Sequence, residues 1–80
     1  MSTNKQAVEV VVHIDEHLQQ EQITRLENSL GSDKGIMEAR INRRRNHLML
    51  VDYLPAEISA LDVLGYVKSR GYSAALVGGL

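Results

Sequence analysis

The stretch from Ile36 to Leu54, IMEARINRRRNHLMLVDYL, decides the fold, because it contains two extended segments joined by a short polar turn. In the first segment, 36–41, apolar and charged residues alternate, which predicts a strand with Met37, Ala39 and Ile41 facing a core. The second segment, 47–54, is rich in apolar residues and suits a partner strand, with Leu48 and Leu50 expected in the core. The residues between them, 42–46, begin and end with asparagine, which tolerates turn dihedrals, so the whole stretch predicts a β-hairpin.

The sequence before this hairpin predicts a strand followed by a helix. The segment 8–14 is rich in β-branched residues, and its alternate positions predict one core-facing side made of Val8, Val10, Val12 and Ile14. From about Leu18 to Leu30 the chain lacks Gly and Pro and has Ile23, Leu26 and Leu30 at helical spacing. Gly31 follows at once and suits the left-handed turn that ends many helices.

The sequence after the hairpin predicts a second helix and a last strand. Pro55 ends the strand before it, and Ser59 with Asp62 three residues later is typical of a capping box at a helix start. The expected apolar stripe of this helix consists of Leu61, Leu64 and either Val67 or Lys68. Gly71 is expected to end the helix, and 72–77 is the last predicted strand.

The predicted order is therefore strand, helix, strand, strand, helix, strand. This order is typical of an α+β, ferredoxin-like sandwich, in which an antiparallel four-stranded sheet carries both helices on one face. We expect a flexible N-terminus over residues 1–6, one domain over 7–77 and a flexible tail over 78–80.

Composition excludes several classes of function. The 80-residue chain has no cysteine, which removes disulfides, thiolate metal sites and cysteine nucleophiles. Nine Lys and Arg against ten Asp and Glu give a net charge of −1, and Tyr53 is the one aromatic residue on the strand that stacks bases in RNA-binding domains, so no nucleic-acid partner is expected. Without a long apolar run or a signal-peptide core, we expect a cytoplasmic protein with no membrane insertion. No catalytic constellation is present, so no enzyme is predicted.

Several motifs resemble the heavy-metal-associated domain, a family that includes copper chaperones and the soluble domains of metal-pumping ATPases. The resemblance covers residues 8–77 and is most specific in GIMEARIN (35–42), HLMLVDYLP (47–55) and SRGYSA (69–74). It implies the ferredoxin-like fold. The family carries its metal on a Met-Thr-Cys-x-x-Cys loop after the first strand. Here Ile14 matches the methionine, while Glu16 and Gln19 stand at the two cysteine positions.

The loop after the first strand remains a candidate metal site with different ligands. His13, Asp15, Glu16 and His17 offer two imidazoles and two carboxylates, donors that suit divalent zinc, nickel or copper. The alternative is a solvated turn in which Asp15 is the helix N-cap and Glu16 lies in the first helical turn. No resident cofactor is expected, but a divalent metal ion is the alternative.

Two further candidates lie elsewhere in the chain. The resemblance places Tyr72 close to Glu16 and Gln19, and the alternative role of this tyrosine is to pack beneath the loop. Three consecutive arginines, Arg43, Arg44 and Arg45, stand at the hairpin tip with Arg40 nearby, and they could dock an acidic protein surface or merely be a solvated turn.

These observations favour a small non-catalytic domain that acts through a protein partner or through self-association. The candidate surfaces are the arginine hairpin, the edge strands and an apolar strip of Val11, Met49 and Val51 on the sheet face without helices. The alternative function is handling of a divalent metal by the histidines and carboxylates of the loop.

Overall fold

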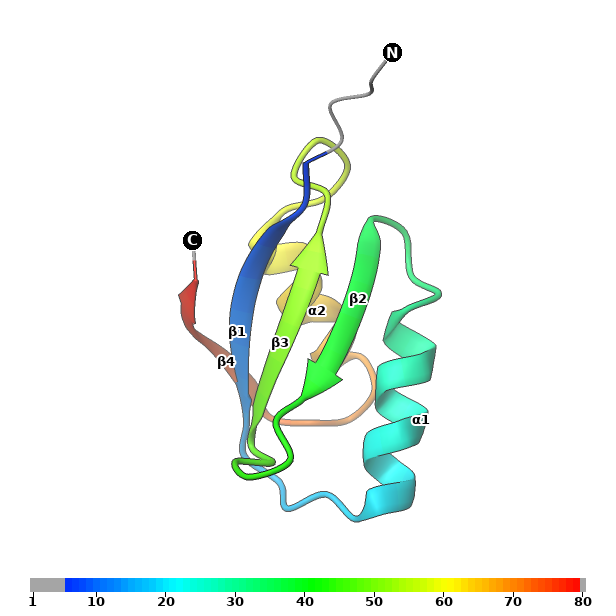
Figure 1. The fold of residues 1–80 in the computed structure, drawn as a ribbon, viewed down its shortest axis with the longest axis vertical. Coiled ribbons are helices and arrows are strands. Elements are labelled where there is room, and N and C mark those ends of the chain that lie inside the picture. The colour runs from blue at the N-terminus through cyan, green and yellow to red at the C-terminus, as the bar shows by residue number, and fades with distance from the viewer. Residues whose placement is uncertain (1–5, 80) are drawn as a thin grey trace.

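Four strands form one antiparallel sheet, and two helices cover one of its faces (Figure 1). This computed structural model describes residues 6–79, so the predicted N-terminal segment, apart from Gln6, and Leu80 of the predicted tail lie outside the described residues. The elements in chain order are β1 (Val8–Ile14), α1 (Gln20–Leu30), β2 (Ile36–Ile41), β3 (Leu48–Tyr53), α2 (Ala60–Lys68) and β4 (Ala74–Gly79). Their order confirms the predicted ferredoxin-like fold, and β4 extends two residues beyond the predicted strand end.

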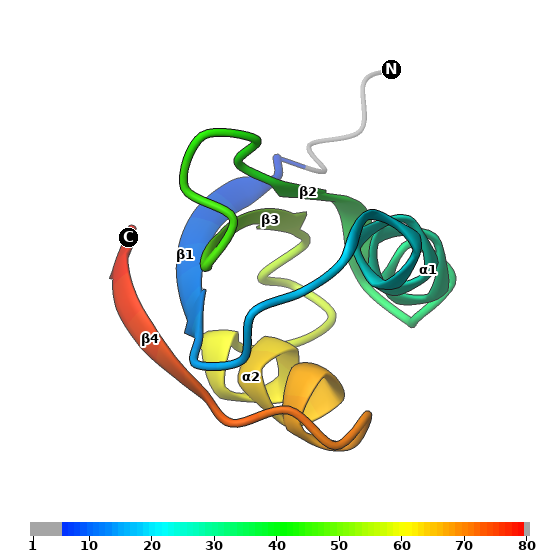
Figure 2. The same ribbon diagram turned by 90° about the horizontal axis from the view of Figure 1, so that it is seen from below.

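The order of strands in the sheet is β2-β3-β1-β4, so β2 and β4 are the edge strands. Seen from below, α1 and α2 lie on one side of the sheet, while the β2–β3 hairpin curls toward the other side (Figure 2). No helix among residues 6–79 is long and apolar enough to cross a membrane.

The core-facing residues of β1 are those that the sequence predicts, but two predictions for the hairpin strands were wrong. Val10 of β1 is opposite Val51, and Val12 is opposite Met49, so Met49 and Val51 lie in the core and are fully buried. Because side chains alternate along a strand, Leu48 and Leu50 lie instead on the open face beside Val11. Alternation alone could not decide between the two faces of a strand that is almost continuously apolar.

Met37 is a second departure in this hairpin, because it is 58% exposed rather than part of the core. The pairing of β2 with β3 shifts between Ile36 and Glu38, where one extra residue is accommodated as an irregularity. The bulge turns Met37 outward and leaves Ile36, Ala39 and Ile41 facing the core.

The start of α1 differs from the prediction. The helix begins at Gln20, and its N-cap is Gln19, whose backbone N–H donates to the side-chain oxygen of Gln22 at 2.7 Å. Asp15 is therefore not the N-cap, and Glu16 precedes the helix. Leu18, which is 2% exposed, anchors the incoming loop in the core before the helix begins.

Of the other predictions for the helices and their ends, one is confirmed and others are wrong. The Ser59–Asp62 capping box is confirmed, since each backbone N–H donates to the other's side chain, at 2.9 and 3.1 Å. Leu61, however, is 71% exposed, because Val63 and Val67 form the buried side of α2. Gly31 has a φ of −61° and makes no left-handed turn, whereas Gly71, after the end of α2, has a φ of 93°.

Candidate interaction site at the arginine hairpin

One end of the molecule brings together three segments that are far apart in the sequence. These are the loop after β1 (residues 15–19), the β2–β3 hairpin (42–47) and the chain just before β4, and they meet at the lower end of Figure 1. The backbone N–H of Ile14 donates to the carbonyl of His47 at 2.8 Å, and that of Asp15 donates to the carbonyl of Ser73 at 2.8 Å. The sequence left the position of the hairpin relative to the loop open, and the structure places them side by side.

The hairpin turn is held in one conformation by backbone and side-chain contacts. The Asn42 side-chain oxygen accepts from the backbone N–H groups of Arg44 and Arg45 at 2.8 and 2.9 Å. The carbonyl of Arg45 accepts from the N–H of Leu48 at 2.9 Å. Asn42 therefore suits this turn because its short side chain accepts backbone hydrogen bonds, and not through the special dihedrals expected from sequence, since no non-glycine residue among 6–79 has a positive φ.

The guanidinium groups at the turn differ in how they are used. Arg43 donates through Nη1 to the side-chain oxygen of Gln20 at 2.9 Å, which ties the hairpin to the start of α1. Arg40 is paired with Glu38 at 3.2 Å on β2. Arg44 and Arg45 are exposed, and their side chains contact no acceptor among residues 6–79. Their donors therefore face solvent at the molecule's end.

The acidic residues of the loop are already engaged. Both carboxylate oxygens of Glu16 accept from the backbone N–H of Ser73, at 3.0 and 3.1 Å, which closes the loop against the chain before β4. Asp15 Oδ1 lies 3.2 Å from His13 Nδ1. In the part of the chain that the structure describes, no three or more His, Asp or Glu residues are arranged to hold a metal ion.

His47 is the residue at this end that the sequence analysis did not single out. Its ring lies 5.8 Å from that of His13, with 18° between the ring planes, and 5.9 Å from that of His17. Its Nδ1 lies 2.8 Å from the carbonyl oxygen of Ile14. One feature of the sequence could have identified His47. It is the first residue after the predicted turn, and antiparallel pairing brings that position to the end of β1.

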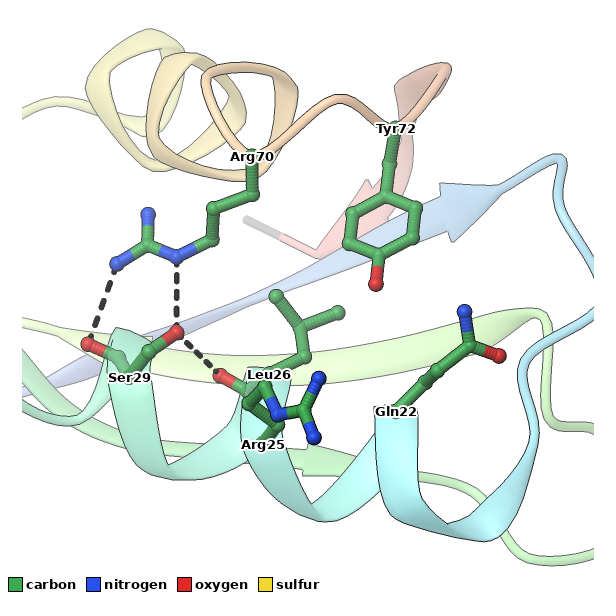
Figure 3. A pocket seen from close by; sticks show the side chains of 6 residues that line it. All are labelled: Gln22, Arg25, Leu26, Ser29, Arg70 and Tyr72. Carbon is green, nitrogen blue, oxygen red and sulfur yellow. Dashed lines mark hydrogen bonds between the residues drawn. The ribbon is translucent and has the colours of Figure 1, made fainter.

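Tyr72 lies with its ring toward α1 (Figure 3). It lines a pocket of about 400 Å³ together with four residues of α1 and one that follows α2, namely Gln22, Arg25, Leu26, Ser29 and Arg70. The ring is partly buried against the core, while the next residue, Ser73, is the one that contacts Glu16. Tyr72 thus packs on the helix side of the sheet, and its expected place near Glu16 and Gln19 stays a prediction.

Comparison with known proteins identifies the fold. No protein-family model matches the chain, and no curated protein sequence is significantly similar to it. The N-terminal domain of a potential copper-translocating P-type ATPase from Bacillus subtilis, in the Cu(I)-loaded state, is 24% identical with a TM-score of 0.78, over 92% of this chain and 91% of that one. A copper-binding domain of another P-type ATPase is 15% identical with a TM-score of 0.80, over 90% and 96%.

A chaperone shares the same architecture. The apo copper chaperone of Enterococcus hirae is 15% identical with a TM-score of 0.74, over 85% of this chain and 98% of that one. At these identities the likeness concerns the fold, which is that of heavy-metal-associated domains. These neighbours are metallochaperones and transporter domains rather than catalytic enzymes.

The metal in the Bacillus subtilis neighbour, monovalent copper, does not fit the residues present here. That soft ion selects thiolate and thioether ligands, and this chain has no cysteine. Glu16, for which the sequence resemblance implies one of the family's two cysteine positions, has a hard carboxylate that accepts from the backbone N–H of Ser73. The fold is therefore present without donors for that ion in this loop.

Proposed function

We propose that the chain is a non-catalytic interaction domain of the heavy-metal-associated fold that has lost its copper loop. In this proposal it binds a protein partner with an acidic surface through Arg43, Arg44 and Arg45. The observation that carries the proposal is the position of these arginines on an ordered turn beside the loop after β1, with Arg44 and Arg45 exposed and uncommitted among the described residues.

Arginine suits this role because its planar guanidinium can donate two parallel hydrogen bonds to one carboxylate. Two of the three guanidinium groups are free to do so, and the third can exchange Gln20 for a stronger charged acceptor. Because the turn is already ordered by Asn42, binding does not have to order the backbone that presents the arginines.

The test compares wild-type protein with the variant Arg43→Glu, Arg44→Glu, Arg45→Glu as baits in extract of the native host. Proteins that only the wild type retains are identified by mass spectrometry, purified and titrated into ¹⁵N-labelled chain. We expect amide shifts confined to residues 42–47 and 15–20, and a loss of affinity of at least about tenfold in the variant.

The control variant changes the same charge elsewhere, through Arg25→Glu, Lys34→Glu, Lys68→Glu. These three side chains are exposed and lie outside the hairpin, so this variant should retain the partner. Equal capture by the wild type and the hairpin variant would remove the arginines from the function.

Binding of a divalent metal is the second candidate, and the position of His47 favours it. A carbonyl oxygen only accepts, so the contact of His47 with Ile14 requires a hydrogen on Nδ1 and leaves Nε2 free. His13 likewise directs Nδ1 toward Asp15. Histidine ligands in metal sites are commonly oriented by such a contact at the other ring nitrogen.

Titration with zinc, nickel and divalent copper, followed by histidine and amide shifts, tests this candidate. Metal binding predicts shifts in the loop and at His47, and at least about tenfold weaker binding in His13→Ala and His47→Ala. Absence of shifts at micromolar metal would leave only the interaction function.

A further inference from the structure

The open face of the sheet is divided along the strands into an acidic row, an apolar middle and a basic end. The register pairs Glu9 of β1 with Asp52 of β3, and Asp52 with Glu38 of β2, so three carboxylates stand in one row across three adjacent strands. Like charges directly opposite one another in a sheet are destabilising. Arg40 pairs with Glu38 at 3.2 Å, and neither Glu9 nor Asp52 has an ion-pair partner among residues 6–79.

Apolar side chains fill the next positions of β1 and β3 on this face, while Arg40 of β2 lies opposite Leu50 and is paired with Glu38. Val11 is opposite Leu50, and Leu48 follows two residues further along β3, where it is opposite His13. On β4, Val77 lies at the register irregularity between Leu76 and Gly78 and is 55% exposed. No helix among the described residues covers this side of the sheet (Figure 2).

The arginine hairpin stands at the far end of the same face. It curls toward the open side in Figure 2, beyond His13 and Leu48. The acidic row therefore carries three carboxylates, and the hairpin offers the exposed guanidinium groups of Arg44 and Arg45, while Arg43 is held by Gln20 of α1. An apolar band of roughly 13 Å along β3 separates Asp52 from Leu48.

From this arrangement we propose that the open face binds a second copy of the chain, in a two-fold symmetric dimer. This inference rests on the proposed function and names the acidic partner surface as the Glu9–Asp52–Glu38 row. A two-fold interface uses the same patch on both copies, so the patch must complement itself. A two-fold axis that lies between the two copies, parallel to the sheet and across the strands at the level of the apolar band, places each hairpin over the partner's acidic row.

The dimer is expected to be weak and sensitive to salt. Four strands about 4.8 Å apart and about seven residues long present a flat face on the order of 400 Å². Stable interfaces bury roughly 800 Å² per partner, so a dissociation constant in the micromolar range or above is expected. Because the charged contacts lie at the rim of the face, added salt should screen them.

Sedimentation equilibrium of the whole chain, over a wide concentration series at low and high ionic strength, measures this association. The decisive variants reverse the two charged ends separately. One is Arg43→Glu, Arg44→Glu, Arg45→Glu, and the other is Glu9→Lys, Glu38→Lys, Asp52→Lys. Each variant alone should dissociate at least tenfold more readily than the wild type, because like charges then meet at both ends of the interface.

An equimolar mixture of the two variants should associate again at wild-type strength, because opposite charges meet at both ends of a mixed dimer. Restored association also shows that both variants fold. If circular dichroism shows that either triple variant is unfolded, Arg44→Glu and Asp52→Lys replace them in the same design.

A monomeric wild type across the series, or a mixture that stays monomeric, would overturn the dimer. Hairpin-dependent capture of another acidic protein by a monomeric chain would refute self-association alone and leave the proposed function standing. If the chain is monomeric and the hairpin variant captures the same proteins as the wild type, both the dimer and the proposed function are refuted.

Discussion

At the scale of single residues, Gly35 occupies a position that a side chain cannot enter without cost. Its φ is 80°, in the left-handed region, and a Cβ built there would lie 2.8 Å from Cγ1 of Ile58. Ile58 is buried and β-branched, so its side chain has little freedom to move away. The Gly35 carbonyl also accepts from the N–H of Leu54 at 2.8 Å, which fixes the backbone there.

Gly35→Ala should therefore lower the free energy of unfolding by about 3 kcal/mol, the sum of left-handed strain and overpacking. Gly71→Ala is the matched control, because Gly71 has a φ of 93° but nothing within 4 Å of a built Cβ. It should cost only the backbone strain, about 1 kcal/mol. Urea denaturation followed by circular dichroism measures both, and equal losses would show that Ile58 does not oppose the new methyl group.

The histidines illustrate how residue identity and residue position differ in predictability. His13 and His17 are close in sequence, so their proximity could be proposed from the loop alone. His47 lies thirty-four residues from His13 along the chain, and only strand pairing brings its ring to within 5.8 Å. A search for metal or binding clusters by local spacing could not find it.

At the scale of elements, the sequence predicts the existence of every strand and helix, and in β1 and α1 the apolar period also matches the burial. The apolar alternation of β1 and the spacing of Ile23, Leu26 and Leu30 in α1 both agree with the structure. The Ser59 cap of α2 is equally local, since its partner Asp62 is three residues away. Sequence patterns that extend over one or two helical turns can be interpreted without knowledge of the tertiary structure.

The failures at this scale share a different cause. In β3 nearly every residue could enter a core, so its orientation was set by the pairing of Val10 with Val51, which sequence periodicity does not contain. The bulge that exposes Met37 lies in the β2–β3 register, and it likewise has no local signature. The true start of α1 depends on Leu18 reaching the core before the helix begins.

The candidate site likewise combines features that the sequence predicts with features that only the tertiary structure shows. The arginines at 43–45 were identified directly from the sequence, because a run of like charge on a turn is visible in one segment. Their position beside the loop, and the acidic row opposite them along the sheet, follow from the strand order and register. An interaction surface that combines several strands becomes visible only once the register is known.

At the scale of the whole molecule, a net charge of −1 conceals a strongly uneven distribution. The open face has carboxylates at one end and guanidinium groups at the other, while the helix-covered face holds the core. A net charge near zero predicts that the protein has no electrostatic field of one sign over its whole surface. It carries no information about how charges are arranged on one face. Near-neutral chains can therefore still present self-complementary surfaces.

The two helices are joined at their C-terminal ends by Arg70, whose guanidinium reaches from the end of α2 to α1 (Figure 3). Its Nε donates to Ser29 Oγ at 2.8 Å, and its Nη1 donates to the carbonyl of Tyr66 at 2.6 Å. Its Nη2 pairs with Asp33 at 2.9 Å, and both side chains are only 25% exposed. One side chain thus connects α2, the end of α1 and the loop before β2.

Arg70→Ala should lower the free energy of unfolding by about 2 kcal/mol, because it removes charged hydrogen bonds and leaves the Asp33 carboxylate partly buried without its partner. In a domain of this size such a loss corresponds to a fall in melting temperature of roughly 10 °C. Arg70→Lys should recover only part of this stability, since an ammonium group keeps the charge but cannot reach several acceptors as a planar guanidinium does.

The control variant is Lys68→Ala, at an exposed residue two positions away, which should change stability by less than about 0.5 kcal/mol. Thermal and urea unfolding of these variants, with a double-mutant cycle through Asp33→Ala, separate the ion pair from the contacts to Ser29 and Tyr66. If Arg70→Ala and Lys68→Ala unfold alike, the helix ends are held together by apolar packing and the guanidinium contributes nothing to the stability of the whole molecule.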